Sequence, residues 1–343
     1  MPRQRSARRE PAIRTIAALR KHLQVAMQLE HATIPPYFTA WLTIHPGTNV
    51  EAAEIIRSVM LEEMLHLTLA ANLLNAVGGR PRLTQPGFVA RYPHALPHSG
   101  DTFKVSIEKF SPAALRTFLR IERPEPRGAK PQPGHFTTIA QFYLAIDQAI
   151  DALCDRLGEQ RVFSGAVDRQ VRPSDYYGSG EIVVVKDRDS AHRAIAEIIE
   201  QGEGAPGGIF DGDAQILGDG DGREIAHYYR FNEVLQGRHY TARDTPRSGP
   251  TGSRLDVDFD AVYPIRPNAR ASAHARGTGA RRAMDEFRVG YRALLASLER
   301  AFNGERTHFT EAIARMFQLH QQGVALARTP SGDGKTTLGI DFG

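Results

Sequence analysis

Five acidic and histidine residues occupy positions where a helical pattern places apolar side chains. They are Glu30, Glu63, His66, Glu224 and His227. A carboxylate on the core face of a helix is unfavourable unless it is paired or bound to a metal. Glu63 and His66 are three residues apart, as are Glu224 and His227, and this spacing puts both side chains of a pair on one helical face. The sequence therefore predicts a buried metal site with ligands from three helices.

The residue types indicate which metal this site would bind. Two Glu-x-x-His pairs, with glutamates from two other helices, form the ligand set of carboxylate-bridged di-iron sites in four-helix bundles. Imidazole and carboxylate ligands suit iron or manganese, whereas copper(I) and structural zinc favour thiolate. We therefore predict one or two iron ions, with manganese as an alternative. The competing interpretation is a set of buried hydrogen bonds from the glutamates to histidines and arginines.

Three more residues are candidates for this site. Glu62 lies four residues before His66 and could be a metal ligand in place of Glu63. The apolar residues of the predicted helix define an inward face that includes Glu63, so Glu62 is then expected to point to solvent or to hydrogen-bond a ligand. A four-helix site needs one more carboxylate, which is expected within residues 137–157. In that range, Gln141 can bind a metal only through its amide oxygen, which carries no charge. Asp147 is the nearest carboxylate. The alternatives are a second metal that is weakly bound, absent or held by Asp147.

Aromatic residues adjoin the proposed ligands. Tyr37, Tyr143 and Tyr228 are candidates for the wall of a substrate pocket, where a hydroxyl donates a hydrogen bond or takes part in electron transfer. The alternative for each is core packing with a satisfied hydroxyl. His31 follows Glu30 by one residue, roughly 100° around the helix, and is expected at the surface or as a hydrogen-bond partner of a ligand.

Helices must position these residues, and apolar periodicity predicts them over most of the chain. The predicted helices span about 12–32, 50–77, 112–121, 137–157, 190–202, 223–236 and 280–327. Ile34, Pro35 and Pro36 are expected to end the first helix, because consecutive prolines remove hydrogen-bond donors. Residues 182–185 read as a short strand. The sequence thus predicts a mainly α fold with a few short strands.

The composition is that of a globular protein, with 343 residues, 41% hydrophobic and 24% charged. We expect one domain over 12–343, with insertions at about 80–135, 160–222 and 243–278. Residues 1–11 are expected to form a disordered basic arm. Much of the excess positive charge lies there, and without other basic patches we predict no nucleic-acid partner.

Other features bear on compartment and assembly. No run of about twenty apolar residues exists, so no membrane partner is predicted. The single cysteine, Cys154, fits a reducing compartment, and we predict a cytoplasmic protein. No extended heptad seam specifies an oligomer, so a homo-oligomer stays open.

Several longer motifs resemble one known family. They are LEHATIPPY at 29–37, EEMLHL at 62–67, NLLNAVGG at 72–79, TIAQFY at 138–143, QGEGA at 201–205 and AHYYRF at 226–231. Together they resemble the ferritin-like domain family typified by iminophenylpyruvate dimer synthase of violacein biosynthesis. The resemblance runs from about residue 12 to the end of the chain. It implies a ferritin-like four-helix bundle with long inserted connections, and it carries the five predicted metal ligands over to this sequence.

The resemblance also implies a function. We expect an iron-dependent oxidase or oxygenase of secondary metabolism that uses dioxygen and a small amino-acid-derived substrate, such as an aromatic imine or a 2-oxo acid. One alternative is an iron-binding or ferroxidase protein without an organic substrate. Another is a non-catalytic partner in a biosynthetic complex.

Overall fold

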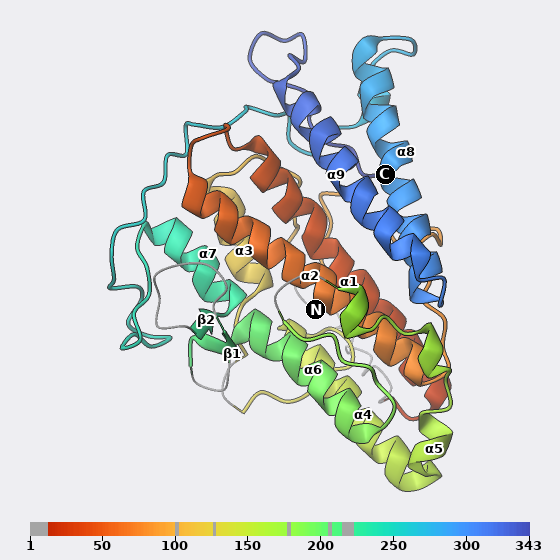
Figure 1. Cartoon of the computed structure of the whole chain (residues 1–343). Coiled ribbons are helices and arrows are strands. Elements are labelled where there is room, and N and C mark those ends of the chain that lie inside the picture. Colours follow the sequence, from red (N-terminus) through yellow and green to blue (C-terminus); the bar gives the residue numbers. More distant parts are fainter. Residues whose placement is uncertain (1–12, 100–102, 126–127, 177–179, 205–207, 215–222) are drawn as a thin grey trace, which may run out of the picture.

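The centre of the molecule is a pair of long helices, α1 (Ile16–Thr43) and α2 (Val50–Ala76), which pack along each other (Figure 1). The computed structural model describes residues 13–99, 103–125, 128–176, 180–204, 208–214 and 223–343. The predicted basic arm lies outside these residues. Thr15 caps α1, because its hydroxyl accepts a hydrogen bond from the backbone N–H of Ala18.

Two further helices complete a four-helix bundle. α4 (Ile139–Leu157) packs against α1, and α6 (Arg188–Glu203) packs against both α2 and α4. Side chains cap both helices at their first turn, Thr138 on α4 and Asp187 on α6. The short helix α5 (Glu159–Val162) follows α4 directly.

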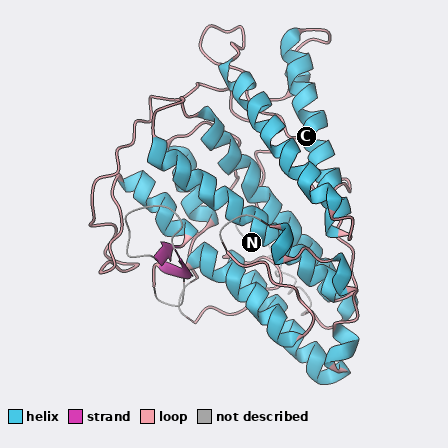
Figure 2. Cartoon of the chain, in the orientation of Figure 1, coloured by secondary structure: helices cyan, strands magenta, loops and turns pink. Residues whose placement is uncertain are grey.

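One end of the bundle is covered by shorter elements. α3 (Pro112–Ile121) packs against α7 (His227–Gln236), and α7 also contacts α2 and α6. A two-stranded antiparallel sheet, β1 (Phe210–Ala214) and β2 (Arg223–Ile225), leads into α7 (Figure 2). These elements bring residues from outside the four bundle helices to the bundle centre.

A helical hairpin, α8 (Gly279–Phe302) and α9 (Thr307–Arg328), lies against the other side of the central pair (Figure 1). α1 and α2 are therefore enclosed between α4 and α6 on one side and this hairpin on the other. Residues 29–37 and 65–77 are buried without interruption, as expected for helices that are covered on all faces. In the described part of the chain, no helix combines the length and apolar character needed to cross a membrane. Short 3-10 turns complete the fold, at Val167–Arg169, Pro173–Asp175 and Ala271–Ala273.

The prediction that the prolines end the first helix is wrong, because α1 continues through Pro35 and Pro36 to Thr43. Proline at position 36 cannot donate to the carbonyl of Ala32, four residues earlier. The hydroxyl of Tyr92 donates to that carbonyl instead, at 2.8 Å. A side chain from a distant loop thus satisfies the acceptor that the proline leaves open.

The strand predicted at residues 182–185 is also not formed. Side-chain amides take the place of a partner strand. Gln170 exchanges two hydrogen bonds with the backbone of Val185, at 2.6 and 2.7 Å, and Asn72 donates to the carbonyl of Val183 at 3.0 Å. The buried backbone is therefore satisfied without a sheet.

Candidate metal centre

α1 and α2 bring Glu30, Glu63 and His66 together at the centre of the bundle. The Nδ1 atom of His66 lies 3.7 Å from Oε2 of Glu30 and 3.6 Å from Oε1 of Glu63. All three side chains are buried. The spacing of three residues in α2 puts Glu63 and His66 on one face, as the sequence predicted.

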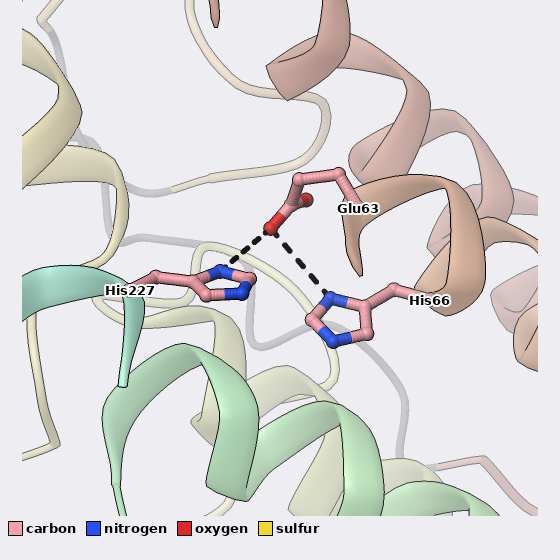
Figure 3. Close-up of side chains that lie close together, drawn as sticks. All are labelled: Glu63, His66 and His227. Carbon is pink, nitrogen blue, oxygen red and sulfur yellow. Dashed lines mark ion pairs between the residues drawn. The ribbon is translucent and has the colours of Figure 1, made fainter. Parts of the chain in front are cut away.

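His227 joins this group from the first residue of α7. Its Nδ1 atom lies 2.9 Å from the same Glu63 oxygen that faces His66 (Figure 3). The two imidazole rings are 5.3 Å apart between centroids. One potential ligand atom from each of these three residues lies within 4.8 Å of the others. One oxygen of Glu63 therefore faces both imidazoles.

The outer nitrogen of each imidazole has an acceptor. Nε2 of His66 lies 2.9 Å from the amide oxygen of Gln201, and Nε2 of His227 lies 3.0 Å from Oε2 of Glu62. An oxygen at Nε2 favours the tautomer with its proton there. In a neutral ring, both Nδ1 lone pairs then face the group of carboxylates. Nδ1 of His227 makes no hydrogen bond among the described residues, despite its short distance to Glu63.

Glu122 supplies a carboxylate that the sequence analysis missed. It is the C-cap residue of α3, is buried, and its Oε2 lies 3.6 Å from Nδ1 of His227. Glu122 has no histidine three residues away and precedes a proline-rich loop, so spacing gave no signal. Its position directly after the apolar end of α3 was the only local hint. The bundle thus receives from α3 the acid that was expected from α4.

Each of three carboxylates has one oxygen held by a hydroxyl and the other near an imidazole nitrogen. The hydroxyl donors are Tyr143 to Glu30 (2.6 Å), Thr33 to Glu63 (2.7 Å) and Tyr37 to Glu122. A fixed outer oxygen limits the rotation of the carboxylate, so the inner oxygen keeps its direction. This arrangement is suited to holding a metal between the carboxylates and the imidazoles.

A cavity of about 20 Å³ adjoins this group and is closed on one side by Glu203, at the end of α6. Glu30, Glu63, His66 and Glu122 line the same cavity. The Glu203 carboxylate accepts hydrogen bonds from the backbone N–H groups of residues 125 and 140, at 2.6 and 3.2 Å. Spacing did not single out Glu203, although it lies in the motif at residues 201–205. Such a volume has room for about one water-sized molecule.

Burial and mutual repulsion shift the protonation of these groups. Burial raises the pKa of Glu30 to about 7 and that of Glu203 to about 8. Burial also raises the pKa of Glu122 above its usual range, and the nearby Glu63 charge adds to this. Although burial acts in the opposite direction, Glu30 and Glu63 raise the pKa of His66 to about 10. Without a metal, the group therefore retains several protons near neutral pH.

Glu62 and Glu224 both contact Arg230, one turn into α7. Arg230 Nη1 lies 2.9 Å from Glu62 Oε1 and 3.0 Å from Glu224 Oε1. Glu62 is therefore buried and orients His227, in agreement with the hydrogen-bonding alternative and not with a solvent position. The predicted helical pairing of Glu224 with His227 is wrong, because Glu224 belongs to β2 and the helix begins only at His227.

The remaining candidates lie apart from the carboxylate group. Gln141 belongs to the capping box of α4, and its amide oxygen accepts from two backbone N–H groups at 3.1 and 3.2 Å. Asp147 pairs with His192 at 2.5 Å. Tyr228 packs edge-on against the neighbouring tyrosine ring at 5.1 Å. His31 is neither at the surface nor a partner of the carboxylates. It is buried on the side of α1 that faces the α8–α9 hairpin, where it contacts a tyrosine of α8. Tyr37 and Tyr143 are the two predicted tyrosines that reach the carboxylates.

Buried carboxylates and imidazoles lie together at the centre of a helical bundle, which is the arrangement in which carboxylate–histidine metal sites are built. The chain belongs to the Ferritin-like family, whose model matches residues 23–236. This confirms the predicted fold class, a mainly helical ferritin-like bundle with few strands.

A solved structure supports the same fold. A ferritin-like protein from Caulobacter vibrioides is similar with a TM-score of 0.65 and 20% sequence identity, over 96% of this chain and 100% of that chain. No curated protein sequence matches this one.

Proposed function

We propose that this protein binds two iron ions and uses them for oxidation with dioxygen. The proposed ligands are Glu30, Glu63, His66, Glu122, Glu203 and His227. The observation that carries the proposal is the common direction of the inner oxygens of three buried carboxylates and the Nδ1 atoms of two imidazoles. Manganese is the alternative metal, because it accepts the same ligand types.

The donor set fits a pair of ions. Four carboxylates and two histidines form the usual ligand set of di-iron carboxylate bundles. Here Glu122 and Glu203 fill the places that the sequence analysis assigned to Glu224 and to the helix at 137–157. Nδ1 of His227 also fits, since a buried ring nitrogen without a hydrogen bond is the kind of atom that a metal satisfies.

When bound, iron would supply the electron transfer and dioxygen activation that side chains cannot provide. The protein's own groups orient the ligands and restrict access. Tyr143 and Tyr37 hold the outer oxygens of Glu30 and Glu122. In the metal-free protein, burial raises the pKa of Glu203 to about 8, so its proton must leave before the carboxylate can bind a metal. Isoleucines at positions 121, 139 and 198 line the cavity and limit the entry of water.

Two reaction classes are supported by different observations. The sequence motifs favour an iron-dependent oxidase or oxygenase of secondary metabolism that acts on a small amino-acid-derived substrate. These motifs resemble those of the family typified by iminophenylpyruvate dimer synthase. The cavity beside the carboxylates, at about 20 Å³, favours a ferroxidase in which dioxygen is the only small-molecule reactant. An organic substrate needs that cavity to widen.

Metal analysis tests the binding proposal. We expect about two irons per chain after anaerobic loading with ferrous iron and removal of unbound metal. Glu122→Gln should lower the metal content, because it removes a charged ligand and nearly preserves the shape. Glu224→Gln is the matched control and should retain both ions, because Glu224 contacts Arg230. Less than about one iron per wild-type chain, or equal loss in both variants, contradicts the proposed ligand set.

Dioxygen consumption separates the two reaction classes. The oxidase hypothesis predicts that an aromatic imine or 2-oxo acid accelerates consumption by the iron-loaded protein and is itself converted. The ferroxidase hypothesis predicts consumption in proportion to added ferrous iron, with no effect of the organic compound. Glu63→Gln protein given the same ferrous iron serves as the background control, because it should bind less of it.

A further inference from the structure

A second cavity, of about 650 Å³, lies between the central pair α1 and α2 and the hairpin of α8 and α9. It shares no lining residue with the cavity beside the carboxylates. Its walls are almost entirely aliphatic and aromatic, with Phe38 and Trp41 from α1, Met60 from α2, Leu298 from α8 and Met316 from α9. Both its size and its apolar lining are typical of sites that enclose a small organic molecule.

A buried polar pair, His31 and Tyr291, lies within this apolar lining. Nε2 of His31 is 2.7 Å from the hydroxyl oxygen of Tyr291, and both residues line the cavity. His31 is 1% exposed and Tyr291 is 5% exposed. Nδ1 of His31 makes no hydrogen bond among the described residues. Among the polar side chains that line the cavity, this pair combines burial with a ring nitrogen that has no hydrogen bond, so it indicates which groups a ligand must offer.

Counting hydrogens shows that the pair has a donor to spare. Tyrosine has one O–H, and the imidazole ring carries at least one N–H in any protonation state. The single hydrogen bond between the two residues uses one of these hydrogens. The hydrogen left over is either the Nδ1–H of His31, which is fixed in the ring plane, or the hydroxyl hydrogen of Tyr291, which rotates to meet an acceptor. An acceptor in the cavity therefore favours the arrangement in which Nε2–H donates to the tyrosine oxygen. The Tyr291 hydroxyl hydrogen is then available to a molecule in the cavity.

We propose that this cavity binds a small apolar molecule with one neutral oxygen acceptor, such as an ester, ketone or alcohol, and that the Tyr291 hydroxyl donates to that oxygen. A neutral acceptor fits better than a carboxylate, because a buried charge requires a charged partner. Arg57, the lining residue with a permanent charge, is 43% exposed in its side chain and pairs with Glu54. This proposal is independent of the metal ligands and concerns the metal-free protein equally.

Trp41 provides a built-in reporter for this site. It is the only tryptophan of the chain and it lines the cavity. A bromine atom quenches tryptophan fluorescence on contact, so a brominated ligand that enters the cavity should quench Trp41 with saturation. The probes are methyl bromoundecanoate, bromoundecanoic acid and bromododecane, which carry a neutral acceptor, a charged acceptor and no acceptor.

We expect the ester to saturate at one site per chain and to bind roughly 2- to 10-fold more tightly than bromododecane, the range expected for one net hydrogen bond. Tyr291→Phe should remove this advantage and leave the affinity for bromododecane unchanged. Tyr240→Phe is the matched control. It also loses a hydroxyl hydrogen bond, here with Asn232, but it packs in a separate cluster and should behave as wild type.

Leu298→Phe tests whether the probes bind in this cavity, because the larger side chain fills part of it. The affinity for both the ester and bromododecane should fall. This test remains available if Tyr291→Phe does not fold. Four results overturn the proposal. They are the absence of saturable quenching, equal ester affinity in wild type and Tyr291→Phe, insensitivity to Leu298→Phe, and tighter binding of the acid than of the ester. A protein that elutes as a dimer whose Trp41 no probe reaches also overturns it, because a second copy then covers the cavity.

Discussion

Glu30 and Glu63 face the same imidazole of His66, yet their replacement by glutamine should change the stability of the metal-free protein in opposite directions. Glutamine keeps the shape of glutamate and stays neutral. Burial raises the pKa of Glu30, so its ionised form is unfavourable in the fold. Although burial acts to raise it, the imidazoles of His227 and His66 beside Glu63 lower its pKa, so its charge is favourable there.

The size of the Glu30 effect follows from its pKa shift. Folding raises this pKa from 4.5 to about 7, and each unit corresponds to about 1.4 kcal/mol. The folded state binds more protons than the unfolded state between these values, so stability falls as the pH rises through this window. Above it, Glu30→Gln should be more stable than wild type by about 3 kcal/mol, and below about pH 4 the difference should vanish. Glu63→Gln should lose roughly 3–5 kcal/mol, because it leaves buried imidazolium groups without their shared partner.

Urea unfolding of the metal-free proteins, measured at about pH 5 and about pH 8.5, is the direct assay. The wild type, both variants and the surface control Glu54→Gln are compared at each pH. Metal loading of the same samples should show that both centre variants bind less iron. The reasoning is refuted if Glu30→Gln is less stable than wild type at the higher pH, or if the two variants shift in the same direction.

Three more outcomes follow from other contacts. Iron affinity should increase from pH 6 to 8, because the protons held by the carboxylates and imidazoles must leave when iron binds. Titration calorimetry in buffers of different ionisation enthalpy should record this proton release. Equal heats in all buffers would contradict it. Arg230→Met should lower the free energy of unfolding by about 3–5 kcal/mol, because it leaves Glu62 buried without its cation; thermal and urea unfolding check this, with Arg254→Met as an exposed control. Tyr92→Phe should lower the free energy of unfolding by about 1–3 kcal/mol, because it leaves a carbonyl of α1 without a donor. The loss should be smaller in a Pro36→Ala background, where the backbone N–H of residue 36 is restored. An equal loss in both backgrounds would disprove this role.

The helical fold and the proposed ligands on α1 and α2 could be predicted from local sequence. Glu30, Glu63 and His66 lie within long helices, where a residue's number fixes the face on which it lies. The i, i+3 spacing of Glu63 and His66 therefore carried over directly into space. Even so, Pro35 and Pro36 misled the local reading, because the donor that compensates for them comes from Tyr92, outside the helix.

The rest of the centre depends on tertiary contacts that spacing does not encode. Glu122 and Glu203 lie at helix ends, where the chain leaves the helical repeat and residue spacing no longer fixes direction. Glu224 had the right spacing to His227, but the helix starts three residues later, and Arg230 binds its carboxylate. The sequence by itself determined a helical bundle with a buried carboxylate–histidine core. Only the tertiary structure decided which acids complete that core, because distant helix ends meet through packing.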